Sequence, residues 1–235
     1  LGLHLIYNYF LHSFNFYMKL TIFDLDNTIL KGDSDYSWIE FLINNNHVDR
    51  DFYRNKNDYF YDQYVNGKLD IHEYCEFALS TFIILGKEKA EKLLDIFMKE
   101  IIEPMVNVYI LRVLHEHYEA GDTLLLASAT NTILVNRIGA RLDFKNIIGT
   151  DPEIKNGSIT GKILGDPAIG DGKLKKVVSW MQDNGKLDFR ETTFYSDSIN
   201  DLPLLESVEK PIAVNPDDSL RKESILRGWE IIDLT

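Results

Sequence analysis

Phe23-Asp24-Leu25-Asp26-Asn27-Thr28 is the stretch on which the fold depends, because it ends the apolar run of residues 19–25, which predicts a short buried strand. Its two carboxylates stand two residues apart, and in extended backbone they would point the same way. Asp24 could then attack phosphorus as a nucleophile while Asp26 handles the proton of the leaving group, with Thr28 fixing a carboxylate through its hydroxyl. A turn rich in Asp that caps a helix explains the same residues equally well. The stretch alone does not decide between these two interpretations.

A second strand-like run, residues 192–195, also ends in acids, since Asp197 and Asp201 follow it four residues apart across a predicted strand-to-helix turn. If both acid clusters lie at one edge of a sheet, three or four carboxylates converge there. Two carboxylates about 4 Å apart repel by roughly 4 kcal/mol at an effective dielectric constant near 20, so such a site needs a cation. Oxygen ligands around a phosphate favour Mg²⁺ over zinc, and a chain whose only cysteine is Cys75 has no cysteine-rich zinc site.

In the remaining chain the predicted secondary-structure pattern changes once. Helical periodicity fills residues 36–103, with about four predicted helices and no strand between them. After Glu103-Pro104, helices and strands alternate, which is typical of a parallel sheet with crossover helices, and Asn156-Gly157 predicts a hairpin. We therefore expect an α/β fold: a Rossmann-like, doubly wound, mostly parallel sheet in residues 18–34 and 104–235, interrupted by an all-helical cap in residues 35–103. Such sheets bind ligands beyond the carboxyl ends of their strands.

Within these regions, the pattern predicts further strands and helices. The predicted strands after the helical stretch are residues 123–127, 192–195, 211–214 and 230–232. The predicted helices are residues 52–65, 71–82, 87–102, 106–120, 130–142, 174–184 and a start at 201–207. Aromatic residues at helical spacing, such as Trp38 and Phe41, are interpreted mostly as the core of the helical insert.

Residues 1–17 contain no charged side chain and are rich in Leu, Phe and Tyr, which invites a signal-peptide or membrane interpretation. There is no cationic leading region, no small-residue cleavage site, and polar residues break the apolar run. We interpret this stretch as an N-terminal extension outside the catalytic fold, with Met18 as the natural start. The net charge of −12 and pI near 4.9 argue against nucleic acid or an anionic membrane as a partner. A small-molecule partner and a cytoplasmic location are expected.

Four segments in order along the chain resemble the four motifs of the haloacid dehalogenase superfamily. Asp24-x-Asp26-x-Thr28 is similar to the first, Ser128 after the strand-like residues 124–127 to the second, Lys173 to the third, and Asp197-Ser198-Ile199-Asn200-Asp201 to the fourth. The helical insert directly after the first motif further resembles the subgroup of phosphoserine phosphatase and histidinol-phosphate phosphatase-like enzymes.

The resemblance implies a phosphate ester as substrate and a division of roles. Asp24 would attack phosphorus and become an aspartyl phosphate, while Asp26 protonates the leaving alcohol and later activates water. The resemblance also implies a phosphate-binding group, a metal group and two supporting residues. The phosphate would contact Thr28, Ser128 and Lys173; Mg²⁺ would bind the Asp24 carboxylate, the Asp26 backbone carbonyl and Asp197; Asn200 and Asp201 would support them.

The chain departs from the phosphoserine enzymes at two places. Those enzymes have two glycines after the serine of the second motif, where this chain has Ala129-Thr130, and a glutamate for the substrate ammonium where this chain has Asp33. Asp33 or Asp35 could bind a cationic group of the substrate, or could simply lead into a helix at Tyr36.

Three other functions share some of these residues. A phosphotransferase or mutase would pass the phosphoryl group to another alcohol instead of water. A signalling receiver domain would lack both the second acid of the first motif and a helical insert. A catalytically silent phospho-ligand binding module is the third alternative. The sequence does not give the substrate or the oligomeric state.

Overall fold

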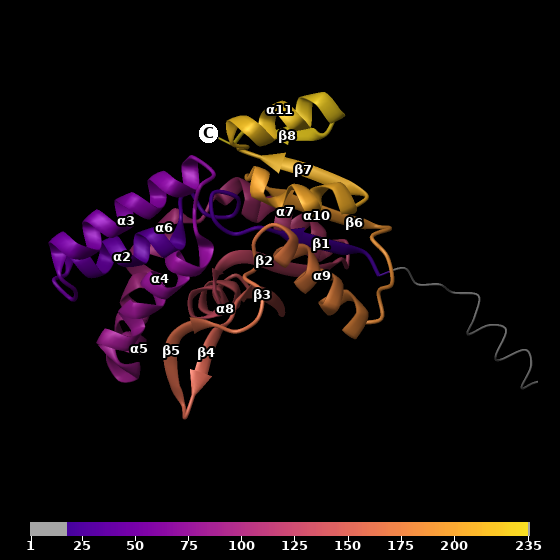
Figure 1. Cartoon of the computed structure of the whole chain (residues 1–235). Helices are drawn as coiled ribbons and strands as arrows, with labels where there is room; N and C mark the ends of the chain where they lie inside the picture. Colours follow the sequence, from indigo (N-terminus) through magenta and orange to yellow (C-terminus); the bar gives the residue numbers. More distant parts are fainter. Residues whose placement is uncertain (1–17, 235) are drawn as a thin grey trace, which may run out of the picture.

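The structure of the protein, a computed structural model, describes residues 18–234, so the expected N-terminal extension lies outside the described residues. Its centre is a six-stranded sheet in the order β3-β2-β1-β6-β7-β8, in which every neighbouring pair is parallel (Figure 1). The strands are β1 (Leu20–Phe23), β2 (Thr123–Asn131), β3 (Asn146–Thr150), β6 (Thr192–Ser196), β7 (Lys210–Val214) and β8 (Glu230–Ile232). The predicted α/β fold is confirmed, and β3 is a strand that was not predicted.

Helices cover both faces of this sheet because successive strand residues point to opposite sides. Phe23 packs on one face, and the adjacent Ile22 packs on the other in a second apolar cluster. The helices that share the cluster of Phe23 are α7 (Val108–Glu119) and α8 (Thr132–Arg141). Those that share the cluster of Ile22 are α9 (Asp171–Asp183), α10 (Leu202–Ser207) and α11 (Asp218–Arg227). The sheet is therefore doubly wound.

Strand β1 marks the point where the strand order reverses. It pairs with β2 on one side and β6 on the other, so Phe23 lies opposite both Leu126 and Tyr195. The chain builds outward from β1 first through β2 and β3, and later through β6, β7 and β8. The carboxyl ends of β1, β2 and β6 are thereby brought side by side, at the position where open parallel sheets bind ligands.

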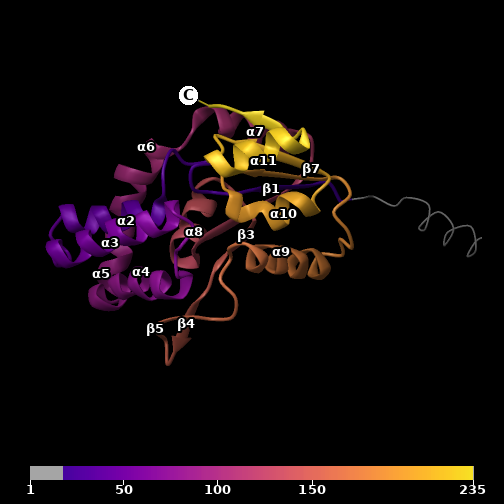
Figure 2. The same cartoon turned by 45° about the horizontal axis from the view of Figure 1, so that its top comes forward.

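An all-helical segment separates β1 from β2 and lies beside the sheet (Figures 1 and 2). It consists of α2 (Ser34–Asn44), α3 (Arg50–Val65), α4 (Ile71–Leu85), α5 (Lys87–Phe97), a π-helical turn η1 (Met98–Ile102) and the short α6 (Glu103–Met105). The side chains of Asp33, Asp49 and Asp70 accept backbone N–H groups at the starts of α2, α3 and α4. Trp38 is buried and stacks on Phe82 with 5.4 Å between ring centroids, so aromatic side chains pack within the segment. This packing is continuous with the apolar cluster of Phe23.

The predicted hairpin is present as β4 (Pro152–Lys155) and β5 (Ser158–Ile163), which pair antiparallel. Asn156 and Gly157 have φ values of 51° and 77°, as a two-residue hairpin turn requires. Strand β5 packs on helix α4 so closely that a Cβ atom on Gly161 would lie 3.2 Å from Cδ1 of Ile83. The hairpin therefore contacts the all-helical segment through α4, and the two lie near each other in Figure 2.

None of the helices in residues 18–234 is both long enough and apolar enough to cross a bilayer.

Candidate active site

A cavity of about 760 Å³, including its open mouth, lies between the carboxyl edge of the sheet and the all-helical segment. Aromatic side chains of that segment, among them Tyr36, Phe60, Tyr64 and Tyr74, form one wall. The opposite wall is polar. Nine of the ten residues predicted from the sequence line the cavity: Asp24, Asp26, Asp33, Asp35, Ser128, Lys173, Asp197, Asn200 and Asp201. Residues up to 177 positions apart in the chain are thus brought to one place.

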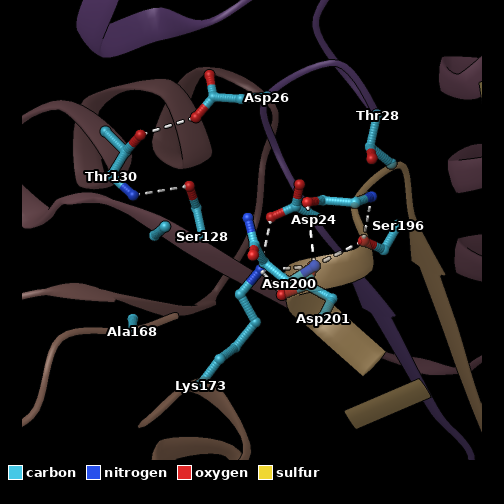
Figure 3. A network of polar contacts seen from close by, with 12 residues as sticks. Asp24, Asp26, Thr28, Ser128, Thr130, Ala168, Lys173, Ser196, Asn200 and Asp201 are labelled. Carbon is cyan, nitrogen blue, oxygen red and sulfur yellow. Dashed lines mark hydrogen bonds and ion pairs between the residues drawn. The ribbon is translucent and has the colours of Figure 1, made fainter. Parts of the chain in front are cut away.

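Lys173 joins the first and last motifs at the floor of the cavity (Figure 3). Its Nζ atom donates to Oδ1 of Asp24 at 2.8 Å and to the Asp201 carboxylate at 2.7 Å, and all three side chains are buried. The Ser196 hydroxyl donates to Asp201 at 2.7 Å. Asp201 therefore holds Lys173 in place, and Lys173 in turn faces Asp24.

Burial sets the charge balance of these groups. It raises the pKa of Asp24 to about 7, with Lys173 opposing that rise and Asp201 adding to it. Burial alone would lower the pKa of Lys173, but the attraction of Asp201 and Asp24 outweighs it, so the pKa of Lys173 is raised and the amine stays protonated. Asp197 has its pKa raised well above the usual range by burial and by the nearby Asp24 and Asp201.

Asp26 has different hydrogen-bond partners from Asp24. Its Oδ1 accepts the backbone N–H of Ser34 at 2.6 Å. Its Oδ2 accepts the hydroxyl of Thr130 at 2.7 Å (Figure 3). Burial, together with repulsion from Asp33, raises the pKa of Asp26 to about 7. A carboxyl group with this pKa can give up and regain a proton near neutral pH.

Ser128 lies beyond the predicted second-motif strand, within β2 as the structure defines it. Its hydroxyl oxygen accepts the backbone N–H of Thr130 at 3.1 Å, and the side chain is buried but lines the cavity. The Ser128 hydroxyl proton is free to point into the cavity, where it could donate to a phosphate oxygen.

Thr28 lies elsewhere than a phosphate-binding role would require. Its side chain is fully buried, it is outside the cavity lining, and its hydroxyl donates to Oδ1 of Asp197 at 3.4 Å. The backbone carbonyl of Asp197 accepts the N–H of Asp217 at 2.8 Å. Thr28 thus contacts the carboxylate of Asp197 and Asp217 contacts its backbone. The contact of Thr28 is the kind expected of a residue that fixes a carboxylate.

Asp33 and Asp35 stand at the start of α2, at the junction of the sheet and the all-helical segment. Asp33 caps α2, accepting the N–H of Tyr36 at 2.7 Å, and Asp35 accepts Nδ2 of Asn131 at 2.7 Å. Burial raises the pKa of Asp33, and it raises that of Asp35 well above the usual range, with repulsion from Asp33 and Asp26 contributing. Asp33 therefore caps the helix, and both Asp33 and Asp35 also line the cavity.

The charge of the cavity suits a cation with oxygen ligands. Six aspartates and one lysine are among its described lining residues. In residues 18–234 no three His, Cys, Asp or Glu side chains are arranged to hold a metal ion together. A magnesium ion does not need such a trio, because it commonly binds one or two carboxylates and completes its shell with waters and substrate phosphate. Asp24 and Asp197, which repel each other in the buried site, are two carboxylates that could bind an ion in this way.

Three polar residues contact the predicted acids without having been predicted from the sequence: Ser34, Thr130 and Ser196. Ser34 and Ser196 form hydrogen bonds with the predicted acids, and no local sequence pattern predicts these hydrogen bonds. Thr130 stands in the Ala129-Thr130 stretch that departs from the two glycines of the phosphoserine enzymes, and this departure was an available signal.

Comparisons with known proteins identify the family and relatives of similar sequence and fold. The family model of haloacid dehalogenase-like hydrolases matches residues 21–206. A histidinol-phosphatase of Neisseria meningitidis serogroup C (strain 8013) is 37% identical over 218 residues, which are 92% of this chain and 98% of that protein. A crystal structure of a protein from Bordetella pertussis Tohama I is 36% identical, with a TM-score of 0.87, and the match covers 93% of this chain and 99% of that one. A phosphoserine phosphatase structure has a TM-score of 0.66 at 18% identity, over 93% of this chain and 94% of that one, and shows likeness of fold alone.

Proposed function

The chain belongs to the haloacid dehalogenase-like hydrolase family and is a phosphatase, and we propose that it hydrolyses a small phosphate monoester through a phosphorylated Asp24. The observation that carries this proposal is the placement of two acids with different partners in one cavity. Asp24 faces Lys173 at 2.8 Å, whereas Asp26 is held apart by Ser34 and Thr130. One acid is thereby available as a nucleophile and the other as a proton donor.

The reaction has two steps. In the first, a carboxylate oxygen of Asp24 bonds to phosphorus while the ester P–O bond breaks, and Asp26 gives its proton to the departing oxygen, so that a neutral alcohol leaves. In the second, water attacks phosphorus, Asp26 takes a proton from that water, and the bond between Asp24 and phosphorus breaks. Inorganic phosphate is released and both acids return to their starting state.

Two residues would hold the transferring phosphoryl group. The buried Lys173 amine carries a fixed positive charge close to Asp24, and the Ser128 hydroxyl faces the same cavity. Donors held in advance near the reacting centre stabilise charge that develops on the phosphoryl oxygens without reorganising during the reaction. Asp201 keeps Lys173 in position, and Asn200 lines the cavity beside it.

Mg²⁺ is the cofactor we propose for this site, held by the carboxylates of Asp24 and Asp197 and by the backbone carbonyl of Asp26. When bound, the ion would neutralise charge on the carboxylates and on the phosphate of the substrate. Thr28, through its hydrogen bond to Asp197, would orient that ligand.

For the alcohol part of the substrate we propose an amine or imidazole cation that lies near Asp33 and Asp35. Asp35 is buried and Asp33 partly buried in the cavity wall, and both have raised pKa values, so a positive charge nearby would stabilise their ionised forms. The aromatic wall offers faces to a cation as well. Histidinol phosphate is the first substrate to assay, since the relative from Neisseria meningitidis is a histidinol-phosphatase.

We also propose that residues 35–103 act as a cap domain over a core formed by residues 18–34 and 104–235. The support is that aromatic side chains pack against one another within the all-helical segment, and that this segment lines the cavity opposite the motif residues. A cap in this position would exclude bulk water until the leaving group departs.

The test of the nucleophile is Asp24→Asn, assayed with 4-nitrophenyl phosphate. We expect turnover to fall by about 10³-fold or more, because the amide cannot form the phosphoenzyme. Asp183→Asn, at the exposed end of α9, is the matched control and should keep wild-type activity. Wild-type turnover by Asp24→Asn would refute the assignment.

A further inference from the structure

Thr130 contacts two residues that have different roles in the reaction just proposed. Its hydroxyl donates to Oδ2 of Asp26 at 2.7 Å, while its backbone N–H donates to the hydroxyl oxygen of Ser128 at 3.1 Å (Figure 3). Thr130 is buried yet lines the cavity. One residue therefore connects the acid expected to serve the leaving group with the hydroxyl expected to hold the phosphoryl group.

The two oxygens of Asp26 are not equivalent. Oδ1 accepts the backbone N–H of Ser34 at 2.6 Å, and a backbone N–H can only donate, so a proton on Oδ1 would oppose that hydrogen bond. Oδ2 faces a threonine hydroxyl, which can donate to an ionised carboxylate and can accept from a protonated one. The proton of the acid form therefore belongs on Oδ2, the oxygen that Thr130 contacts.

The Thr130 hydroxyl has a further neighbour that suits this exchange. The hydroxyl of the fully buried Ser34 lies 3.4 Å from it, and either oxygen can be the donor. When Asp26 is protonated, Thr130 can accept from Oδ2 and turn its own proton toward Ser34. When Asp26 is ionised, Thr130 can donate to Oδ2 again. The same side chain thus has a hydrogen-bonding arrangement for each protonation state of Asp26.

We propose that Thr130 is a positioning residue that orients Oδ2 of Asp26, the oxygen that exchanges a proton with the leaving alcohol and then with water. This inference rests on the proposed function, because it assigns Thr130 a role only through Asp26. It implies that removing the Thr130 hydroxyl slows cleavage of the ester bond most for substrates whose leaving group must be protonated.

The experiment compares leaving groups in Thr130→Val, which removes the hydroxyl but keeps the shape of the side chain and the backbone N–H to Ser128. Substrates are 4-nitrophenyl phosphate, phenyl phosphate and benzyl phosphate, in order of increasing need for protonation. We compare kcat/KM, which reports the steps up to departure of the alcohol and not the later attack of water, a step that all three substrates share. We expect kcat/KM for benzyl phosphate to fall by about 10- to 100-fold, the range for losing a hydrogen bond to a charged group. We expect kcat/KM for 4-nitrophenyl phosphate to change by less than about threefold, since its leaving group departs without an acid.

Rescue and coupling separate positioning from a general structural role. Thr130→Ser keeps the hydroxyl and should restore the wild-type dependence on the leaving group. In an Asp26→Asn background, Thr130→Val should have no further effect on benzyl phosphate. Thr132→Val, a change of the same kind at the start of α8 and outside the cavity lining, is the control that should leave all three rates unchanged. If Thr130→Val does not fold, Thr130→Ala takes its place.

Equal loss on all three substrates, or no loss on any, would overturn the role of Thr130, as would an undiminished effect in the Asp26→Asn background. These outcomes differ from failure of the proposed function. If the proposed function is wrong, Asp24→Asn retains activity. If only the role of Thr130 is wrong, Asp24→Asn is inactive, and the loss caused by Thr130→Val is the same for every leaving group.

Discussion

At the scale of single residues, the site depends on how a buried lysine is balanced by acids. Lys173 contacts Asp24 and Asp201, and little of any of these side chains is exposed. A charge removed from such a cluster leaves the others buried and unpaired, and this costs much more than losing an exposed ion pair.

We predict that Lys173→Met lowers the free energy of unfolding by about 3–5 kcal/mol and lowers kcat/KM by about 10²-fold or more. The stability loss arises from repulsion between Asp24 and Asp201 and is measured by urea unfolding. Adding Asp201→Asn should recover part of the stability but none of the activity. Recovery of both would mean that Lys173 serves the fold alone.

The residues of the site were predictable to the extent that they stand at strand ends. Asp24 and Asp197 follow apolar runs, and parallel strands gather such ends at one edge, so their meeting in one cavity is explained by topology. The contact from Thr130 to Asp26 was not predictable, because it joins segments about a hundred residues apart through side-chain packing. Thr28 was expected to fix a carboxylate, but the sequence did not indicate that this carboxylate is Asp197.

At the scale of elements, helix α9 carries Lys173 into the cavity and begins in a crowded place. A Cβ atom on Gly172 would lie 2.0 Å from the carbonyl oxygen of Pro167, so only glycine fits there. Gly170, just before the helix, has φ 54°, a conformation that glycine adopts without strain. The start of α9, and with it the position of Lys173, is therefore fixed by two glycines.

We predict that Gly172→Ala forces the first turn of α9 to shift, at a cost of about 1–3 kcal/mol in the free energy of unfolding. Because Lys173 is the next residue, kcat/KM should fall by about 10- to 100-fold. Thermal melts and steady-state kinetics measure the two effects. Ser179→Ala, exposed on the same helix, should change neither; an unaltered Gly172→Ala enzyme would show that the close contact relaxes freely.

Elements with strong periodicity or turn signals were predicted well, whereas weaker ones were not. The Asn156-Gly157 hairpin formed as expected. The helix predicted over residues 87–102 is instead α5 followed by a π-helical turn, a change in backbone winding that leaves the apolar pattern nearly intact. Strand β3 is short and ends in Gly149-Thr150, so only pairing with β2 stabilises it as a strand.

At the scale of the whole molecule, the acid-rich cavity links stability to pH and to cations. In the folded protein Asp26 keeps its proton to about pH 7, whereas its ordinary pKa is 3.8. Between these values the folded state binds more protons than the unfolded state, so the free energy of unfolding falls as pH rises.

We predict that, in the presence of a chelator, Asp26→Asn raises the free energy of unfolding at pH 7.5 by about 1–3 kcal/mol and changes it little at pH 4. The neutral amide avoids the burial of a charge that the carboxylate carries only at the higher pH. Thermal melts at the two pH values measure the difference. Equal destabilisation at both would contradict the burial argument.

Cation binding provides the complementary test of the same charge balance. Added Mg²⁺ should raise the melting temperature of the wild-type protein more at pH 7.5 than at pH 5, because carboxylates must lose their protons to bind the ion. Chelation should abolish turnover, and Mg²⁺ should restore it. Full activity after chelation would rule out the metal role of Asp24 and Asp197.

The most direct measurement of phosphoryl transfer to Asp24 is peptide mapping by mass spectrometry after the enzyme is mixed with 4-nitrophenyl phosphate and quenched in acid within one turnover. We expect one added phosphoryl group on the peptide that contains Asp24 and none in Asp24→Asn. A phosphoryl group on any other residue, or hydrolysis by Asp24→Asn at the wild-type rate, would contradict Asp24 as the nucleophile.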